Sequence, residues 1–238
     1  MTILESGDCA MNLEQRKIWS DGHKTLTGLL KRPEEHENAV ALFLRLHASL
    51  YASNGEHPEQ PTYEDELLKD IREQTLRSYP VHTPGSKNSI VWHLWHSARI
   101  EDITMNILAA GSGQVLHEAH FADKLQTVHI HSGNGMTDEE ISGFSSSVHI
   151  ESLFEYRKAV ASRTRSILPS LSSEQLRAKL SPARIRRISE EGAVKDTEQW
   201  LIDYWGNKNI AGLVLMPATR HNFIHLNKAM RVKLKLQK

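Results

Sequence analysis

Four long stretches of this chain carry apolar residues at the spacing of an amphipathic α-helix, and they constrain the fold more than any other feature. They cover residues 33–53, 89–109, 151–168 and 217–236. In each stretch, large apolar side chains recur every three or four positions and therefore line one face of a helix. Such a face has to be buried against other elements of the protein. The sequence therefore predicts four long helices that pack together as a four-helix bundle.

Strand patterns are almost absent from the sequence. Apolar and polar residues alternate only in two short pieces, "TVHIHS" at 127–132 and "RVKLKLQ" at 231–237. β-Branched residues are dispersed rather than gathered into runs, which is not typical of strands. We therefore expect an all-α protein, with additional short connecting helices at 63–78, 172–180 and 182–191.

Several residues mark the expected starts of helices. Pro33 and Pro217 suit the first position of a helix, because proline has no backbone N–H to leave unsatisfied there. Ser89 can cap the helix that follows it. Thr137 and Glu140 have the spacing of a capping box, which predicts a short helix after Thr137.

The expected domain organisation is one main domain preceded by an extension. Residues 33–238 hold the four long stretches, without internal repeats or a low-complexity linker. Residues 1–32 have mixed polarity and are expected to form a short helix or loop laid over the bundle. Cys9 lies in this extension without a histidine nearby in sequence, so we interpret it as an incidental thiol, since a nucleophile needs a base within hydrogen-bond reach.

The charge and cysteine content exclude several classes of function. The chain has 29 Lys+Arg and 29 Asp+Glu residues, so it lacks the excess of positive charge that nucleic-acid binding requires. It contains no apolar run of membrane-spanning length and no secretory signal pattern at its start. Its single cysteine fits a reducing compartment. We expect a cytoplasmic protein that binds neither membranes nor nucleic acids.

Two histidines in the last long stretch have the spacing of a metal-binding pair. His221 and His225 are four residues apart and therefore lie one turn above each other on one helical face. Two imidazoles in this position can hold two corners of a metal site. The chain has 14 histidines in 238 residues, for which roughly one pair of this spacing arises by chance. The pattern therefore needs a third ligand from another element.

The best source of a third ligand is the stretch "SIVWHLWHSARIED", residues 89–102. In a helix, His96 shares a face with Trp92 and with three isoleucines, where a bare imidazole needs a polar partner. His93 projects about 60° away from that face. We therefore prefer His96 as the third ligand and keep His93 as the alternative.

The other polar residues of interest have simpler interpretations. His47 interrupts an apolar stripe and is expected to be a hydrogen-bonded core or boundary residue. The histidines of residues 114–150 are interpreted as loop residues that cover a bundle end, with a second metal site as the alternative. Three further groups are expected to be structural: ion pairs at the bundle edge (Arg99, Glu101, Asp102), a solvated face (Arg184, Arg186, Arg187) and apolar anchors (Trp200, Leu201, Tyr204, Trp205).

Two segments, "WHLWHSARIED" at 92–102 and "MPATRHNFIHLNKAMRVK" at 216–233, together resemble the DinB-like superfamily of bacterial metal-binding four-helix bundles. That family places one histidine on its second bundle helix and a pair spaced by four on its last. Carried over to this chain, His96 matches the first position, and His221 and His225 match the pair. The resemblance covers about residues 33–236 and is loosest in the middle third, while the N-terminal extension and the helix at 63–78 are not typical of it.

The resemblance implies a divalent metal ion, nickel or zinc, and frequently a homodimer. Relatives include thiol-dependent S-transferases and isomerases that use low-molecular-weight thiols such as bacillithiol or mycothiol. Three neutral imidazoles leave open positions on a metal for a thiol or water, whose pKa the metal lowers. This predicts a metal-dependent enzyme for transfer or hydrolysis. The alternative is a non-catalytic bundle that binds a metal or small ligand. A nucleic-acid binder is opposed by the balanced charge.

Overall fold

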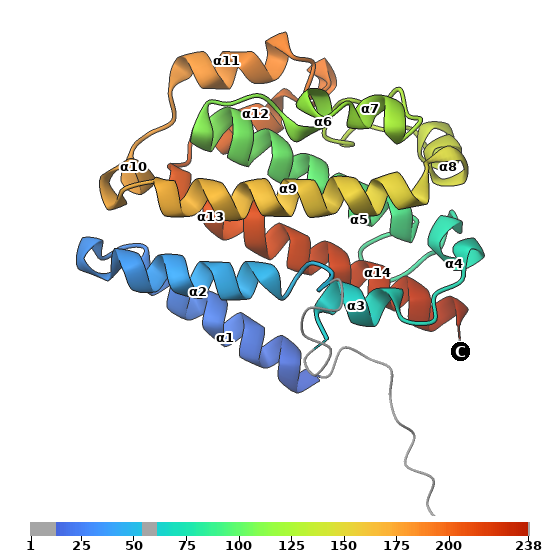
Figure 1. Ribbon diagram of the computed structural model, residues 1–238. Helices are drawn as coiled ribbons and strands as arrows, with labels where there is room; N and C mark the ends of the chain where they lie inside the picture. Colours follow the sequence, from blue (N-terminus) through green and yellow to red (C-terminus); the bar gives the residue numbers. More distant parts are fainter. Residues whose placement is uncertain (1–12, 54–60, 238) are drawn as a thin grey trace, which may run out of the picture.

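The computed structural model describes residues 13–53 and 61–237, and this part of the chain is built almost entirely of helices (Figure 1). Within it, the strand-like pairings are two isolated bridges, Thr83–Ser86 and Lys179–Asn209. The predicted all-α class is therefore confirmed. None of the helices in these two ranges is both long and apolar enough to cross a lipid bilayer. Cys9, predicted to be an incidental thiol, lies outside the described residues.

All four long stretches form helices, and these helices pack against one another. They are α2 (His36–Ala48), α5 (Ile90–Asp102), α9 (Ile150–Ser170) and α14 (Asn222–Leu236). α5 contacts both α9 and α14, and α2 packs on α9 (Figure 1). Every residue of α5 is buried, and the helix continues as a π-helical segment, Ile103–Ala110. α5 is therefore the centre of the core.

The N-terminal segment is more helical than predicted. Instead of a short helix or loop, it forms the 17-residue helix α1 (Leu13–Leu29), which packs on α2 and α13 (Ile210–Leu215). Trp19 stacks on Phe223 of α14 with ring centroids 4.0 Å apart, and its Nε1 donates to the Leu46 carbonyl. Tertiary packing of this face outweighs the weak local helix propensity of a segment that contains glycines. The division into residues 1–32 and 33–238 stays a prediction.

The sequence predicts one helix at 63–78, but the structure has two helices there. They are α3 (Tyr63–Leu68) and α4 (Glu73–Arg77). Between them Asp70 adopts a left-handed backbone conformation with φ of 53°. The end of α14 binds this break: Lys233 donates to two carbonyl oxygens at the end of α3, and Gln237 donates to the carbonyl of Asp70. The helix is interrupted because a distant element takes over its hydrogen bonds.

The sequence predicts that the last long helix begins at Pro217, but the structure shows no helix start there. α13 continues through a π-helical segment, Met216–His221, directly into α14. Proline inside an α-helix removes a backbone hydrogen bond and crowds the carbonyl four residues earlier, and a π-helical turn accommodates such an insertion. Thr219 Oγ1 donates to two carbonyl oxygens of the preceding turn, at 2.9 and 3.0 Å. This wider turn carries His221.

The other predicted helix starts are confirmed. Ser89 Oγ accepts from the backbone N–H of Trp92 at 3.2 Å, and Thr137 forms a capping box with Glu140. Pro33 begins a short 3-10 turn that leads into α2. The remaining helices are short: α6 (Val115–Glu118), α7 (Phe121–Lys124), α8 (Asp138–Ser147), α10 (Ser173–Arg177), α11 (Pro182–Glu190) and α12 (Gln199–Gly206).

The charged residues predicted at the bundle edge lie in the core instead. Arg99, Glu101 and Asp102 are fully buried. Arg99 pairs with Asp102 at 3.0 Å, and Glu101 bonds to Nε2 of His47 at 2.8 Å. Their location differs from the prediction because α5 is enclosed on all sides, so its polar face meets other buried polar groups. The prediction of His47 as a hydrogen-bonded core residue is confirmed.

Two further predictions, one about a solvated arginine face and one about apolar anchors, also need correction. Arg184 and Arg187 do not simply face solvent, because they donate to carbonyl groups where the helix continuing α5 ends. Such contacts satisfy carbonyls that have no partner within the helix. In the aromatic stretch, Trp200 and Tyr204 are 55% and 40% exposed, so only Leu201 and Trp205 act as buried anchors.

Candidate metal centre

His96, His221 and His225 come together where α5 meets the wide turn that precedes α14. One ring nitrogen of each histidine lies within 4.8 Å of those of the other two. The ring centroids are 4.4 to 5.0 Å apart. Three nitrogens bound to one zinc-like ion lie about 3.3 Å apart, so small side-chain shifts would bring these to ligand spacing. The predicted convergence of the two segments is confirmed, whereas a ligand role stays a prediction.

His96 has one nitrogen left for a metal because the other is already bonded. Its Nδ1 lies 2.6 Å from the backbone carbonyl oxygen of Ser132. A carbonyl only accepts hydrogen bonds, so Nδ1 carries the proton and Nε2 has a free lone pair. The Trp92 ring stacks on the imidazole with centroids 4.5 Å apart and 11° between the planes. These two contacts orient the ring, as outer partners of metal-binding histidines do.

The loop that supplies this carbonyl is held close to α5 at Gly133. Gly133 has a φ of +91°, which residues with a side chain rarely adopt. A Cβ at this position would lie 2.6 Å from Cζ3 of Trp95 and 3.2 Å from Nδ1 of His96. Glycine therefore allows the loop to approach α5 closely enough for Ser132 to accept from His96. This role has no signature in the sequence, because the contact uses a backbone carbonyl.

His225 is bonded to a fourth histidine, the alternative ligand His93. Their Nδ1 atoms are 3.0 Å apart, and Nε2 of His93 lies 2.9 Å from Oγ of Ser86. Ser86 Oγ also accepts from the backbone N–H of Asn88 at 3.1 Å. A proton on Nδ1 of His225, donated to His93, leaves Nε2 of His225 for a metal. His93 then lies behind a candidate ligand as its hydrogen-bond partner.

His221 supplies the exposed side of the cluster. His96 and His225 are only 4% and 7% exposed, whereas His221 is half-buried. Nδ1 of His221 is nevertheless buried, and it has no hydrogen-bond partner among the residues that the structure describes. A buried nitrogen without a partner is costly, and coordination to a metal ion would satisfy it. The unpartnered Nδ1 of His221 therefore supports a metal ion at this site, in addition to the short distances between the three histidines.

The four histidines are held in their neutral form. Burial lowers the pKa of His93 to about 3 and that of His96 to about 4. Burial also lowers the pKa of His221 and His225 well below the usual range, and neighbouring histidines add to the effect. Neutral imidazole is the form that coordinates a metal. Three nitrogen donors without a carboxylate suit zinc, nickel or copper better than magnesium or calcium.

A second metal site in the histidine-rich stretch 114–150 is not supported. Within residues 13–53 and 61–237, no second group of three His, Cys, Asp or Glu side chains converges. The rings of His129 and His131 are 5.4 Å apart. Nδ1 of His131, however, accepts from the backbone N–H of Gly133 at 3.0 Å. His131 therefore stabilises the loop that orients His96.

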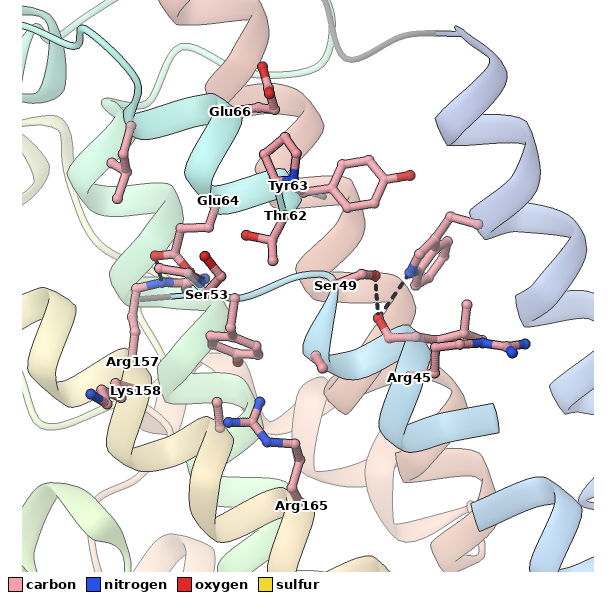
Figure 2. Close-up of a pocket in the computed structure, with 18 of the residues that line it drawn as sticks. Arg45, Ser49, Ser53, Thr62, Tyr63, Glu64, Glu66, Arg157, Lys158 and Arg165 are labelled. Carbon is pink, nitrogen blue, oxygen red and sulfur yellow. Dashed lines mark hydrogen bonds and ion pairs between the residues drawn. The ribbon is translucent and has the colours of Figure 1, made fainter. Parts of the chain in front are cut away.

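A large cavity lies apart from the histidine cluster. It has a volume of about 1170 Å³ and is formed by residues of α1, α2, α3 and α9, and none of the three histidines lines it. Figure 2 shows Arg157 of α9 beside Glu64 of α3 in its wall. The side chains of this ion pair are only 1% and 3% exposed. The cavity and the candidate metal centre are therefore separate features.

Comparison with known proteins adds no family assignment. No protein-family model matches the chain, and no match was found among curated proteins. The interpretation of the site therefore depends on the geometry of this chain's own residues.

Proposed function

We propose that this chain is a metal-binding protein of the DinB-like type, in which His96, His221 and His225 hold one divalent ion, nickel or zinc. The observation that carries the proposal is the convergence of three neutral imidazoles from two distant segments within 4.8 Å. The hydrogen bonds behind two of the rings and the unpaired nitrogen of the third support it. In this proposal α2, α5, α9 and α14 are the four bundle helices, and the protein is a homodimer.

We further propose that the site is enzymatic, with a low-molecular-weight thiol or water as the nucleophile. A bound ion would act as a Lewis acid and make a thiol or water nucleophilic at neutral pH. Three protein ligands leave part of the coordination sphere open for such a molecule. In this proposal the molecule would enter beside His221, because its side chain is only half-buried, whereas the Trp92 ring covers the ring of His96.

The second candidate function is a non-catalytic metal- or ligand-binding bundle. It is favoured by the deep burial of His96 and His225 and by the separation of the large cavity from the cluster. A sealed metal would stabilise the packing of α14 on α5 without meeting a substrate. The two functions differ in whether an external molecule reaches the ion.

Cobalt substitution tests whether an external thiol reaches the site. We expect the purified chain to bind about one equivalent of Co²⁺, because three converging histidines form one site. Adding 2-mercaptoethanol is then expected to produce a sulfur-to-cobalt charge-transfer absorption, since thiolate is a good ligand for an open position. The readout is the ultraviolet–visible spectrum during titration. A cobalt-loaded protein whose spectrum stays unchanged at saturating thiol supports the non-catalytic function instead.

Replacing His93 distinguishes an outer partner from a ligand. We expect His93→Ala to weaken metal binding by about 10- to 100-fold, the usual effect of losing an outer hydrogen-bond partner. His96→Ala is expected to abolish stoichiometric binding. Competition with a chromophoric chelator measures both affinities, and His82→Ala, at an exposed histidine, is the control. Retained binding in His96→Ala together with complete loss in His93→Ala would make His93 the ligand.

A further inference from the structure

Lys228 lies on the same face of α14 as the histidine pair. It follows His221 by seven residues and His225 by three, so helical geometry aligns the three side chains. Lys228 is half-buried, and a Cβ on Gly85 would lie 3.9 Å from its Cε. The loop before α5 therefore lies close to the end of the lysine stem.

The ammonium of Lys228 is close enough to the histidine cluster to act on it electrostatically, and it has no anionic partner among the described residues. After burial, which is the main cause, its charge also helps to lower the pKa of His93, His96, His221 and His225. Lys233 and Lys235 of the same helix donate to backbone carbonyls. In the described ranges, by contrast, the Lys228 Nζ makes neither an ion pair nor a hydrogen bond.

Among the described residues, no carboxylate converges with the three histidines to offset the charge of a bound ion. Three neutral imidazoles would leave both charges of a divalent ion uncompensated, and Lys228 adds a third charge beside them. Burial and the nearby Arg231 lower the pKa of Lys228 itself, which is typical of an ammonium without an anionic partner. A bound anion would relieve this imbalance.

We propose that Lys228 is a specificity-determining residue, which selects small anions such as carboxylates and thiolates for the open position beside His96, His221 and His225. The inference rests on the proposed metal site and specifies that the external molecule bound at its open position is an anion. The ammonium donates a hydrogen bond to the anionic atom and offsets its charge. A neutral ligand has no charge for the ammonium to offset, so it gains less from this contact.

The test compares an anionic and a neutral probe on the cobalt-loaded chain. Azide and imidazole are titrated separately, and their dissociation constants are read from the visible spectrum. In Lys228→Gln, we expect azide binding to weaken about tenfold, the usual effect of losing a charge-assisted hydrogen bond, with imidazole binding unchanged. Lys228→Arg, which keeps the charge, should restore most of the azide affinity. Lys235→Gln, seven residues further along α14, is the matched control and should bind both probes like the wild type.

The inference is overturned if Lys228→Gln binds azide as tightly as the wild type. It is also overturned if azide and imidazole affinities fall by the same factor, because that result indicates a structural role for the side chain. Failure of cobalt to bind the wild type is a distinct outcome, which overturns the metal site itself and this inference with it. Thermal unfolding of each variant verifies that the comparison is made between folded proteins.

Discussion

Replacing either His221 or His225 by alanine is expected to leave the purified protein almost free of divalent metal. The wild type should carry about one ion per chain, because three histidines converge on one point. Either substitution leaves two protein ligands, and we expect the affinity to fall more than the roughly 100-fold that loss of an outer partner can cause. Elemental analysis of the metal content after dialysis measures the effect.

The two substitutions also probe different parts of the site. His225 bonds through Nδ1 to His93, so its loss removes a ligand and leaves a buried imidazole without its partner. Nδ1 of His221 has no such bond within the described residues, so its loss should disturb folding less. His117→Ala, at an exposed histidine of α6, is the control and should keep its metal. Equal metal content in all four proteins would refute the proposed site.

Replacing Glu64 by alanine is expected to lower the free energy of unfolding by about 3–5 kcal/mol. Arg157 donates to both carboxylate oxygens of Glu64, at 2.7 and 3.1 Å, and neither side chain is more than 3% exposed. The same guanidinium also donates to Ser97 Oγ of α5. Without Glu64, a buried cation would lose its ion-pair partner, and α3 would lose this ion pair with α9. Urea denaturation followed by circular dichroism measures the change.

Two comparisons isolate the effect of burial. Glu73→Ala removes an ion pair with the same 2.7 Å distance, but its carboxylate side chain is 68% exposed, so we expect a loss of at most about 0.5 kcal/mol. Glu64→Leu combined with Arg157→Met removes both buried charges and should recover much of the lost stability. A cost of Glu64→Ala no greater than that of Glu73→Ala would contradict this prediction, and would mean that water from the neighbouring cavity (Figure 2) reaches the Arg157 guanidinium in the variant.

The helical architecture follows from patterns that are local in the chain. The apolar spacing in α2, α5, α9 and α14 is repeated within each segment, so it predicts a helix without knowledge of its neighbours. The caps at Ser89 and Thr137 are equally local, because donor and acceptor are three residues apart. The failures at Asp70 and Pro217 have the opposite origin. Each depends on side chains that satisfy backbone groups the local pattern alone would leave unpaired.

The spacing of histidines in the sequence was enough to predict the three candidate ligands, but not the residues that hydrogen-bond to them. His221 and His225 share a helical face, and His96 interrupts an apolar stripe that needs a partner. Lys228 was missed, although its seven-residue distance from His221 follows the same period. The carbonyl of Ser132 and the position of His93 behind His225 had no pattern to reveal them.

Periodicity along the chain was thus enough to identify a helical protein and three imidazoles able to meet. Packing alone assigned which nitrogen His96 offers and which histidine lies behind His225. The physical reason is the range of the interactions involved. A helix face is set by residues three or four positions apart, whereas the hydrogen bond of His96 to Ser132 spans 36 positions and that of His93 to His225 spans 132.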